Sequence, residues 1–247
     1  MKTLTILFSI AVFTQLGQAN QIAESQKEWI AKYQKQKNVP PLEEQLLNTD
    51  PEPSLEGDFK PLFNGNDLNG WTPRGGHCTF EVHDGVIVGT CVKGSPSTYL
   101  STEREDYKDF VFTCDIKWKV QGNTGVQFRS KRKEGKKGET VYGPQVEMEE
   151  PDKNRGWSGG IYGQSCGGYF YPVWLEAHEE ARKAIKGDDW NRVTIQAKGT
   201  LMQTWINGVP VAKIENDEFL EGFFALQVHS GKEGTVHFRN LKVKELN

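Results

Sequence analysis

The sequence predicts an all-β protein, a sandwich of two sheets built from many short strands. From Phe59 onward, apolar and polar residues alternate with a period of two, in segments rich in Val, Ile, Thr, Phe and Trp. Gly, Asn and Asp turns separate these segments, and only Val173 to Ile185 has a helical composition in this region. Such a series is typical of a sandwich or barrel, and the length of several strands favours a large curved sandwich.

The composition limits the function classes. A chain of 247 residues is within reach of a single large all-β domain with extensions. The net charge of −3 argues against a nucleic-acid-binding protein, which usually carries a basic excess. Aromatic residues make up 11% of the chain, enough for a large core and for exposed rings as well.

Residues 1–19 have the pattern of a secretory signal peptide. Lys2 supplies the positive charge, Leu4 to Phe13 the short apolar run, and Gly17-Gln18-Ala19 the small-residue cleavage site. The run is shorter than the roughly 20 residues of a spanning helix, and no later run reaches that length. The sequence therefore predicts a secreted or periplasmic protein with no membrane span.

Residues 20–56 differ from the rest of the chain. Ile22 to Lys37 has helical composition, Pro40-Pro41 ends it, and Asp50 to Ser54 is a Pro-rich linker. We expect a short helical extension joined by this linker to a domain over residues 57–247. Because chain ends outside the alternating pattern are often loosely held, we also expect the extension to be dispensable for the fold.

The strands of the domain follow one another with short connections. Two are joined by Asp84-Gly85 and two by Asn207-Gly208, which are both type I′ hairpin signals. Strands are expected at 78–83, 86–92, 98–102, 109–120, 124–131, 144–150, 190–198, 201–207, 209–214, 222–230 and 234–244.

The first hairpin places two cysteines opposite each other. A two-residue turn pairs His83 with Val86, and counting outward then pairs Cys78 with Cys91 at a non-hydrogen-bonded position. Cα atoms in such a pair lie about 4.5 Å apart, at the short end of the disulfide range. Together with an export signal this predicts a disulfide, the alternative being two buried thiols. No Cys or His spacing resembles a zinc site.

Alternation on three strands predicts one shared polar face. With the apolar residues assigned to the core, three Gln residues are left on the other side, beside Arg, Glu and His. A solvated face more often carries Lys, Glu and Thr, so this set favours a surface that binds a hydroxyl-rich ligand. The alternative is a merely solvated face. The residues are Gln127, Arg129, Gln145, Glu147, Glu149, Gln227 and His229.

An aromatic, glycine-rich stretch runs from Trp157 to Trp174. Aromatic rings on loops suit sugar stacking, and we expect Trp157 and Tyr162 to contact the ligand. For Phe170 and Trp174 we expect packing in the core instead.

Glu147 and Glu149 point the same way along a strand, so a retaining glycosidase is one alternative function. The run Glu147-x-Glu149-x-x-Asp152 has the spacing of the bacterial β-glucanase motif with the acid types exchanged. Pro151 breaks the strand before Asp152, which weakens this interpretation.

Several motifs in order carry a resemblance to a known family. They are Leu62-Phe63-Asn64-Gly65-Asn66-Asp67-Leu68-Asn69-Gly70-Trp71, Gly125-Val126-Gln127-Phe128-Arg129-Ser130, Gly143-Pro144-Gln145-Val146-Glu147-Met148, Asp189-Trp190-Asn191, Trp205-Ile206-Asn207-Gly208, Leu226-Gln227-Val228-His229-Ser230-Gly231 and Phe238-Arg239-Asn240-Leu241. Together they resemble the 3-keto-disaccharide hydrolase domain family over about residues 57–247.

The resemblance implies a concanavalin A-like jelly roll with a sugar cleft on its concave face, and action on glycosides oxidised at C3. Such a reaction needs a base, a group that holds the enolate oxygen and an acid for the leaving group. We expect His229 or Glu147 as the base, Arg129 on the enolate oxygen and Glu149 as the acid.

Two further features of the site follow from these assignments. If Glu147, Glu149 and His229 converge, they could hold a divalent metal, although the sequence makes no cofactor certain.

The substrate bound at this face would be an oligosaccharide or glycoside. A non-catalytic, lectin-like carbohydrate-binding module would use the same Gln, Trp and Tyr surface and is the second alternative.

Overall fold

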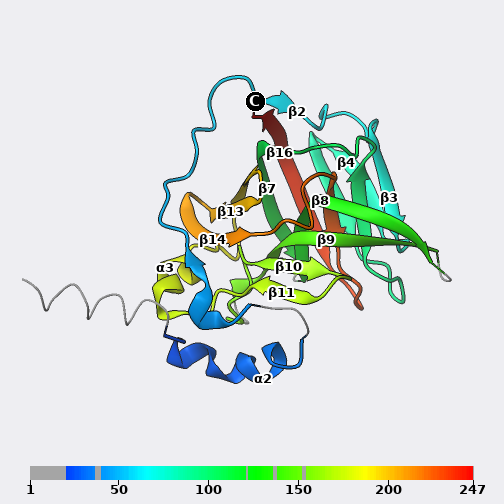
Figure 1. Cartoon of the computed structure of the whole chain (residues 1–247). Coiled ribbons are helices and arrows are strands. Elements are labelled where there is room, and N and C mark those ends of the chain that lie inside the picture. Colours follow the sequence, from blue (N-terminus) through cyan, green and yellow to red (C-terminus); the bar gives the residue numbers. More distant parts are fainter. Residues whose placement is uncertain (1–20, 37–39, 121, 136–137, 152–153, 247) are drawn as a thin grey trace, which may run out of the picture.

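The computed structural model describes residues 21–36, 40–120, 122–135, 138–151 and 154–246. The expected signal peptide lies outside these residues. Within them the chain folds into two antiparallel β-sheets that pack against each other (Figure 1). The all-β prediction is therefore confirmed.

The first sheet has the order β1-β14-β13-β12-β7-β16-β5-β4, and β2 pairs with β16 beside this path. Its members are β1 (Leu46–Leu47), β2 (Lys60–Pro61), β4 (Thr79–His83), β5 (Val86–Thr90), β7 (Phe110–Val120), β12 (Asn191–Lys198), β13 (Leu201–Ile206), β14 (Val209–Glu215) and β16 (Thr235–Glu245).

The second sheet has the order β11-β10-β9-β8-β15-β6-β3 and carries the candidate site. Its members are β3 (Trp71–Gly75), β6 (Thr98–Thr102), β8 (Asn123–Gly135), β9 (Gly138–Glu149), β10 (Ile161–Gln164), β11 (Gly168–Tyr171) and β15 (Phe223–Val228). The strands β8 and β9 form a long hairpin that extends to one side of the molecule (Figure 1).

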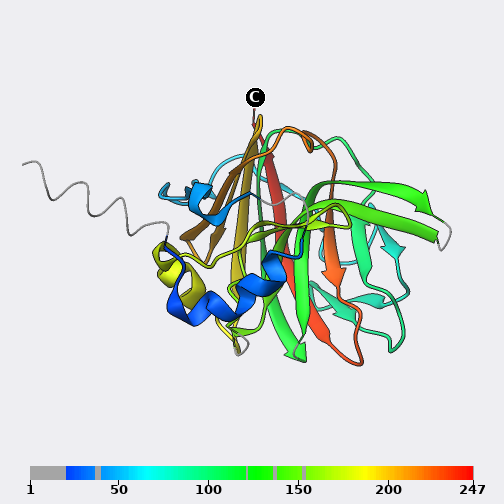
Figure 2. The ribbon, with the colours of Figure 1, turned by 60° about the horizontal axis from the view of Figure 1, so that its bottom comes forward.

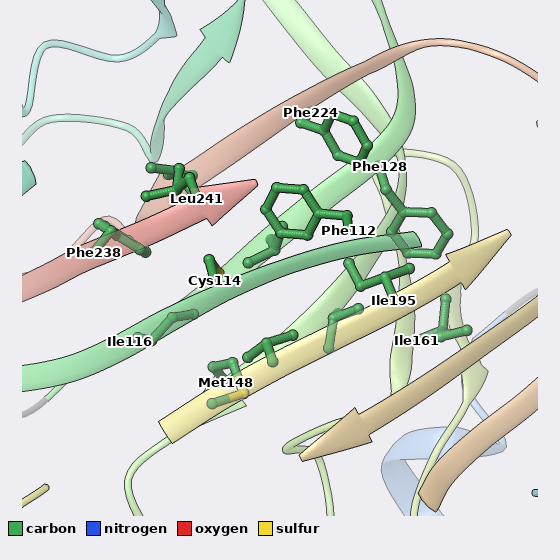
Figure 3. Close-up of a cluster of buried hydrophobic side chains, with 14 of the residues drawn as sticks. Phe112, Cys114, Ile116, Phe128, Met148, Ile161, Ile195, Phe224, Phe238 and Leu241 are labelled. Atoms are coloured by element: carbon green, nitrogen blue, oxygen red, sulfur yellow. The ribbon is translucent and has the colours of Figure 1, made fainter. Parts of the chain in front are cut away.

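One continuous core fills the space between the two sheets (Figure 3). The first sheet contributes Phe112, Ile116 and Ile195, and the second sheet contributes Phe128 and Phe224, all fully buried. Phe112 stacks on Phe224 with ring centroids 4.6 Å apart, which joins the two layers directly. The core thus uses one face of each sheet, and the other face of the second sheet is left for the site.

Both predicted hairpins are present with the expected register. His83 pairs with Val86 and Ile206 with Val209. Asp84 and Asn207 adopt φ values of 49° and 53°, and each is followed by a glycine with positive φ, as a type I′ turn requires. The short strands β1, β2, β3, β10 and β11 were not predicted. The expected helix at Val173 to Ile185 is reduced to η4 (Glu176–His178) and α3 (Glu179–Lys183).

The predicted disulfide is not present, because all four cysteines are free thiols. Cys78 follows the expected register but lies just outside β4, where Thr98 Oγ1 accepts a hydrogen bond from its backbone N–H at 2.9 Å. Its Sγ lies 3.9 Å from the Pro96 carbonyl oxygen, and the Cys78 and Cys91 side chains interact as thiols through a hydrogen bond. Register therefore brings the two side chains together without forming the covalent bond.

The segment before the domain contains η1 (Glu24–Trp29), the four-residue helix α2 (Ile30–Tyr33) and η2 (Leu42–Glu44), in place of one continuous helix. The residues that follow are attached to the first sheet. Glu52 pairs with Arg192 at 2.5 Å, and the buried Asn48 donates to the Thr204 carbonyl at 3.0 Å. These contacts show that part of the segment is attached to the domain. That residues 20–56 are dispensable for the fold stays a prediction, which the melting curve of a chain beginning at Glu56 would test. None of the helices in the described ranges is long and apolar enough to cross a membrane.

Candidate functional site

A cavity of about 340 Å³ lies on the face of the second sheet that points away from the core. Strands β8, β9, β10, β11 and β15 supply part of its wall, and connecting loops and the N-terminal segment supply the rest. It is lined by Trp29, Gln36, Ser97, Asn123, Glu147, Trp157, Tyr162, Gln164, Tyr169, Trp174, Gln227 and His229. Sequence alternation placed Glu147, Gln227 and His229 on one face, and the structure brings all three to this cavity.

A row of buried amides crosses the sheet below the cavity. Gln127 Nε2 donates to Gln145 Oε1 at 3.1 Å, and Gln145 Nε2 donates to Glu147 Oε1 at 2.6 Å. Gln145 Nε2 also lies 3.3 Å from Gln227 Oε1. Gln127 and Gln145 have no exposed surface, so they hold Glu147 in place and do not line the cavity. This corrects our expectation that both amides bind substrate directly. Alternation predicts on which face of a sheet a side chain lies, but it does not predict whether that side chain is exposed.

Glu147 has the electrostatics of a general base. Burial raises the pKa of its carboxyl to about 7, against hydrogen bonds from Asn123 and Gln145 and the charge of Arg155, which lower it. The Asn123 bond joins Nδ2 to Glu147 Oε2 at 3.0 Å. A carboxyl that titrates near neutral pH is well matched to taking or giving a proton in catalysis.

His229 lies at the exposed edge of the same cavity, directly after β15. Its Nδ1 donates to the Ser230 carbonyl oxygen at 2.7 Å, which leaves Nε2 for a ligand. The backbone N–H of Ser230 in turn donates to Ser97 Oγ at 3.0 Å. The histidine is therefore held at its own loop and can serve as a proton donor or acceptor at the rim.

Aromatic residues form the opposite part of the wall. Tyr169 lies between Trp157 and Tyr162, with ring-centroid distances of 5.2 and 4.9 Å. Trp174 is 1% exposed and belongs to the packed cluster behind Tyr169, in line with its predicted core role, although its surface reaches the cavity. Trp157 and Tyr162 both line the cavity. Flat rings around a polar group are the arrangement that suits a sugar, whose ring face is apolar and whose hydroxyls need partners.

The hydroxyls of Tyr162 and Tyr169 stay protonated in this setting. Burial raises the pKa of each, and the charge of Glu147 raises it further. Both phenols can therefore donate a hydrogen bond to an oxygen that gains negative charge near Glu147.

Glu149 does not share the cavity with Glu147. Its carboxylate pairs with Arg155, whose Nε lies 2.7 Å from Oε2, and it lines a separate small hollow of about 30 Å³. Arg155 also stacks over Trp157, its Cζ 3.7 Å from the ring centroid. The predicted acid is thus neutralised by a neighbouring cation and held outside the cavity.

Arg129 lies elsewhere in the molecule, so its predicted place on the shared face is wrong. The register of β8 shifts between Gln127 and Lys131, and Arg129 adopts a φ of 47°, which breaks the alternation. Its buried guanidinium bonds to the Lys108 carbonyl at 2.7 Å and to Asp109 Oδ1 at 3.0 Å. It is a structural residue at the interior side of the sheet.

Two further hollows continue the cavity across the sheet. One of about 280 Å³ shares Asn123 and His229 with it, and one of about 580 Å³ shares Ser97 and Gln164. Both hollows therefore adjoin the cavity through these shared residues. Across the described ranges, no group of three or more His, Cys, Asp or Glu residues is arranged to hold a metal ion, and Glu147, Glu149 and His229 do not converge.

Local sequence patterns did not indicate that Asn123, Trp29 and Gln36 line the cavity. Asn123 precedes the predicted start of its strand and carries no local signal of its role. Trp29 and Gln36 lie in the segment that we expected to be dispensable.

The sequence profile of the 3-keto-alpha-glucoside-1,2-lyase-like domain family matches residues 58–244. The chain belongs to this family. The predicted resemblance is thereby confirmed, and the match starts after the N-terminal segment that carries Trp29 and Gln36.

Solved structures share the fold of this lyase-like domain. A candidate glycosyl hydrolase from Parabacteroides distasonis is 23% identical, with a TM-score of 0.52 over 76% of this chain and 94% of that one. The carbohydrate-binding module CBM66 from Bacillus subtilis is 16% identical, with a TM-score of 0.50 over 71% of this chain and 96% of its own. No curated protein matches the sequence significantly. The lyase-like domain thus has a fold found in carbohydrate-related proteins of both catalytic and binding type.

Proposed function

We propose that the protein cleaves 3-keto-glycosides by removing the proton on C2, with Glu147 as the base. The observation that carries this proposal is a buried carboxyl with a pKa of about 7 in an aromatic cavity of about 340 Å³. The family assignment supports the substrate class, since its name describes a lyase of 3-keto-α-glucosides.

The reaction follows from the acidity that the ketone gives to its neighbour. Glu147 takes the C2 proton, and the electron pair of that bond moves onto the C3 oxygen as an enolate. Tyr162 and Tyr169, whose hydroxyls remain protonated, donate hydrogen bonds to this oxygen in place of the expected Arg129. The enolate then expels the C1 substituent, which leaves with a proton from His229 at the rim. Water that adds to the C1=C2 bond completes a net hydrolysis.

The position of Glu149 favours elimination over direct displacement. A retaining glycosidase needs two carboxyl groups about 5–5.5 Å apart that both face the glycosidic bond. Here the second carboxylate pairs with Arg155 outside the cavity. Of this pair, Glu147 alone lines the cavity.

The experiment is a comparison of 3-keto-α-glucosides with the matching unoxidised glucosides, assayed for release of the C1 substituent. We expect release from the keto compounds alone. Release from both classes at similar rates would favour a conventional glycosidase, and saturable binding without release from either would favour the lectin-like module.

Activity should rise with pH through about 7, because Glu147 acts as a base only when it is ionised. The same group lowers the stability of the fold as pH rises from the ordinary carboxyl pKa to about 7. Its pKa in the folded state lies above the ordinary value, so the folded protein keeps a proton that the unfolded chain loses, and the destabilisation grows across this pH range and is complete above about 7. Melting curves at pH 5 and pH 8 should therefore show Glu147→Gln gaining stability relative to wild type at the higher pH. An unchanged difference between the two curves would show that the pKa is not raised.

We further propose that the protein is exported. The supporting observation is the signal-peptide pattern of residues 1–19. N-terminal sequencing of protein from its native host should find a chain that begins near Asn20, and a mature chain that retains Met1 would contradict export.

A further inference from the structure

The N-terminal segment, defined here as residues 21–36, lies against the edge of the second sheet at β10 and β11 (Figures 1 and 2). Both of its ends are fixed to the domain by hydrogen bonds, one between backbone groups and one from a backbone N–H to a side chain. Ala23 N donates to the Trp174 carbonyl at 2.9 Å, and Tyr169 N donates to Gln36 Oε1 at 2.6 Å. The segment is therefore docked on the domain although the family profile begins only at residue 58.

The contact between segment and domain is a second, smaller core. Tyr33 is 7% exposed and meets Trp174 edge to face, with ring centroids 5.2 Å apart. The fully buried side chain of Gln26 donates to the Asn154 carbonyl at 3.1 Å. Because these side chains are packed against the domain, the segment has a fixed position and is not merely a flexible tether.

Docking brings two residues of the segment to the candidate site. Trp29 is half-buried, packs against the cluster that contains Tyr169 and Trp174, and lines the same cavity as Glu147. Gln36 lines it as well and receives the Tyr169 backbone N–H, so it fixes one of the cavity's own aromatic residues.

We propose that Trp29 is a sugar-binding residue and that the N-terminal segment forms the wall that selects the substrate. This rests on the proposed function only in that the cavity takes a glycoside. An indole ring offers a flat apolar surface to the face of a pyranose, while the amide of Gln36 offers polar contacts to hydroxyls. The indole of Trp29 carries only a hydrogen-bond donor that does not titrate near neutral pH, so it can act in binding but not in proton transfer.

A residue that binds substrate and transition state alike changes KM and leaves kcat unaltered. Aromatic stacking contributes about 0.5–1.5 kcal/mol, equivalent to roughly two- to tenfold in affinity. We therefore expect Trp29→Ala to raise KM for a 3-keto-α-linked disaccharide by roughly two- to tenfold, with kcat within about twofold of wild type.

The test combines that kinetic measurement with calorimetric titration of the unoxidised α-linked disaccharide, which needs no turnover. Trp29→Leu keeps an apolar side chain for packing but removes the flat ring, and Trp29→Phe keeps a ring. We expect Trp29→Leu to bind as weakly as Trp29→Ala with a melting temperature near wild type, and Trp29→Phe to restore most of the affinity. Trp190→Ala is the matched control, because Trp190 is also half-buried but stacks with Arg239, 3.9 Å away, outside the cavity.

The outcomes separate this proposal from the proposed function. If Trp29→Leu binds the disaccharide more weakly but the protein turns over no 3-keto-glycoside, the result would support sugar binding by Trp29 and reject the proposed catalytic activity. Wild-type affinity and KM in both Trp29→Ala and Trp29→Leu would overturn sugar binding by Trp29, whether or not the protein is active. Equal weakening in Trp190→Ala would overturn it as well.

Discussion

Replacing Glu147 with Gln should lower turnover of a 3-keto-α-glucoside by roughly 10²–10⁴-fold, the usual contribution of a positioned general base. The substitution keeps the shape of the side chain, and its one amide oxygen can accept from either Asn123 or Gln145, while the other of these amides must rotate to present its oxygen to the new NH2 group. It removes the group that can take the C2 proton. Because the wild-type carboxyl is buried at the cost of a raised pKa, the variant should fold at least as stably as wild type at neutral pH.

The measurement pairs steady-state kinetics with a melting curve on the same preparation. Glu134→Gln is the control, because Glu134 is an exposed carboxylate of the neighbouring strand β8 and should change neither property. A stable Glu147→Gln variant that retains wild-type turnover would remove Glu147 as the base. An equally large loss in Glu149→Gln would instead point to the paired carboxylates of a glycosidase.

Local signals in the sequence were enough to predict most of the fold. The Asp84-Gly85 and Asn207-Gly208 turns fix the register of their hairpins, because a type I′ turn needs two residues with positive φ and only a few residue types adopt it readily. The strands missed were short ones, such as β10 and β11 in the glycine-rich stretch. Gly163 and Gly168 pair there directly, and glycine carries no side-chain pattern to read.

The candidate site could be predicted only in part, and the failures have a common cause. Alternation placed Glu147 and Gln227 correctly, since β9 and β15 keep their register at these positions, and His229 follows directly after β15. It failed for Arg129, where an irregularity in β8 reverses the side-chain direction. It could not find Trp29, which reaches the cavity through tertiary docking alone. Features that depend on contacts between distant segments leave little trace in local periodicity.

The buried guanidinium of Arg129 leads us to predict a large loss of stability when this residue is replaced. Beyond Lys108 and Asp109, its Nη1 donates to the carbonyl oxygens of Gly199 at 2.7 Å and Phe219 at 3.2 Å. One guanidinium thus joins the start of β7 to two loops of the molecule that are distant in sequence. The planar fork of Arg can satisfy these acceptors together, which a Lys ammonium in the same place cannot do with its single nitrogen.

Arg129→Ala should therefore lower the free energy of unfolding by about 3–5 kcal/mol, because it leaves buried carbonyl groups without donors and opens a void. Turnover per folded molecule, measured well below the melting temperature, should stay near that of wild type, since the side chain does not line the cavity. Arg132→Ala is the matched control: Arg132 lies three residues further along β8 in exposed ion pairs, and its loss should cost at most about 1 kcal/mol. Urea denaturation measures both variants. A variant of Arg129 that unfolds like wild type but loses turnover by 10²-fold or more would return this residue to the enolate oxygen, where sequence alternation alone had placed it.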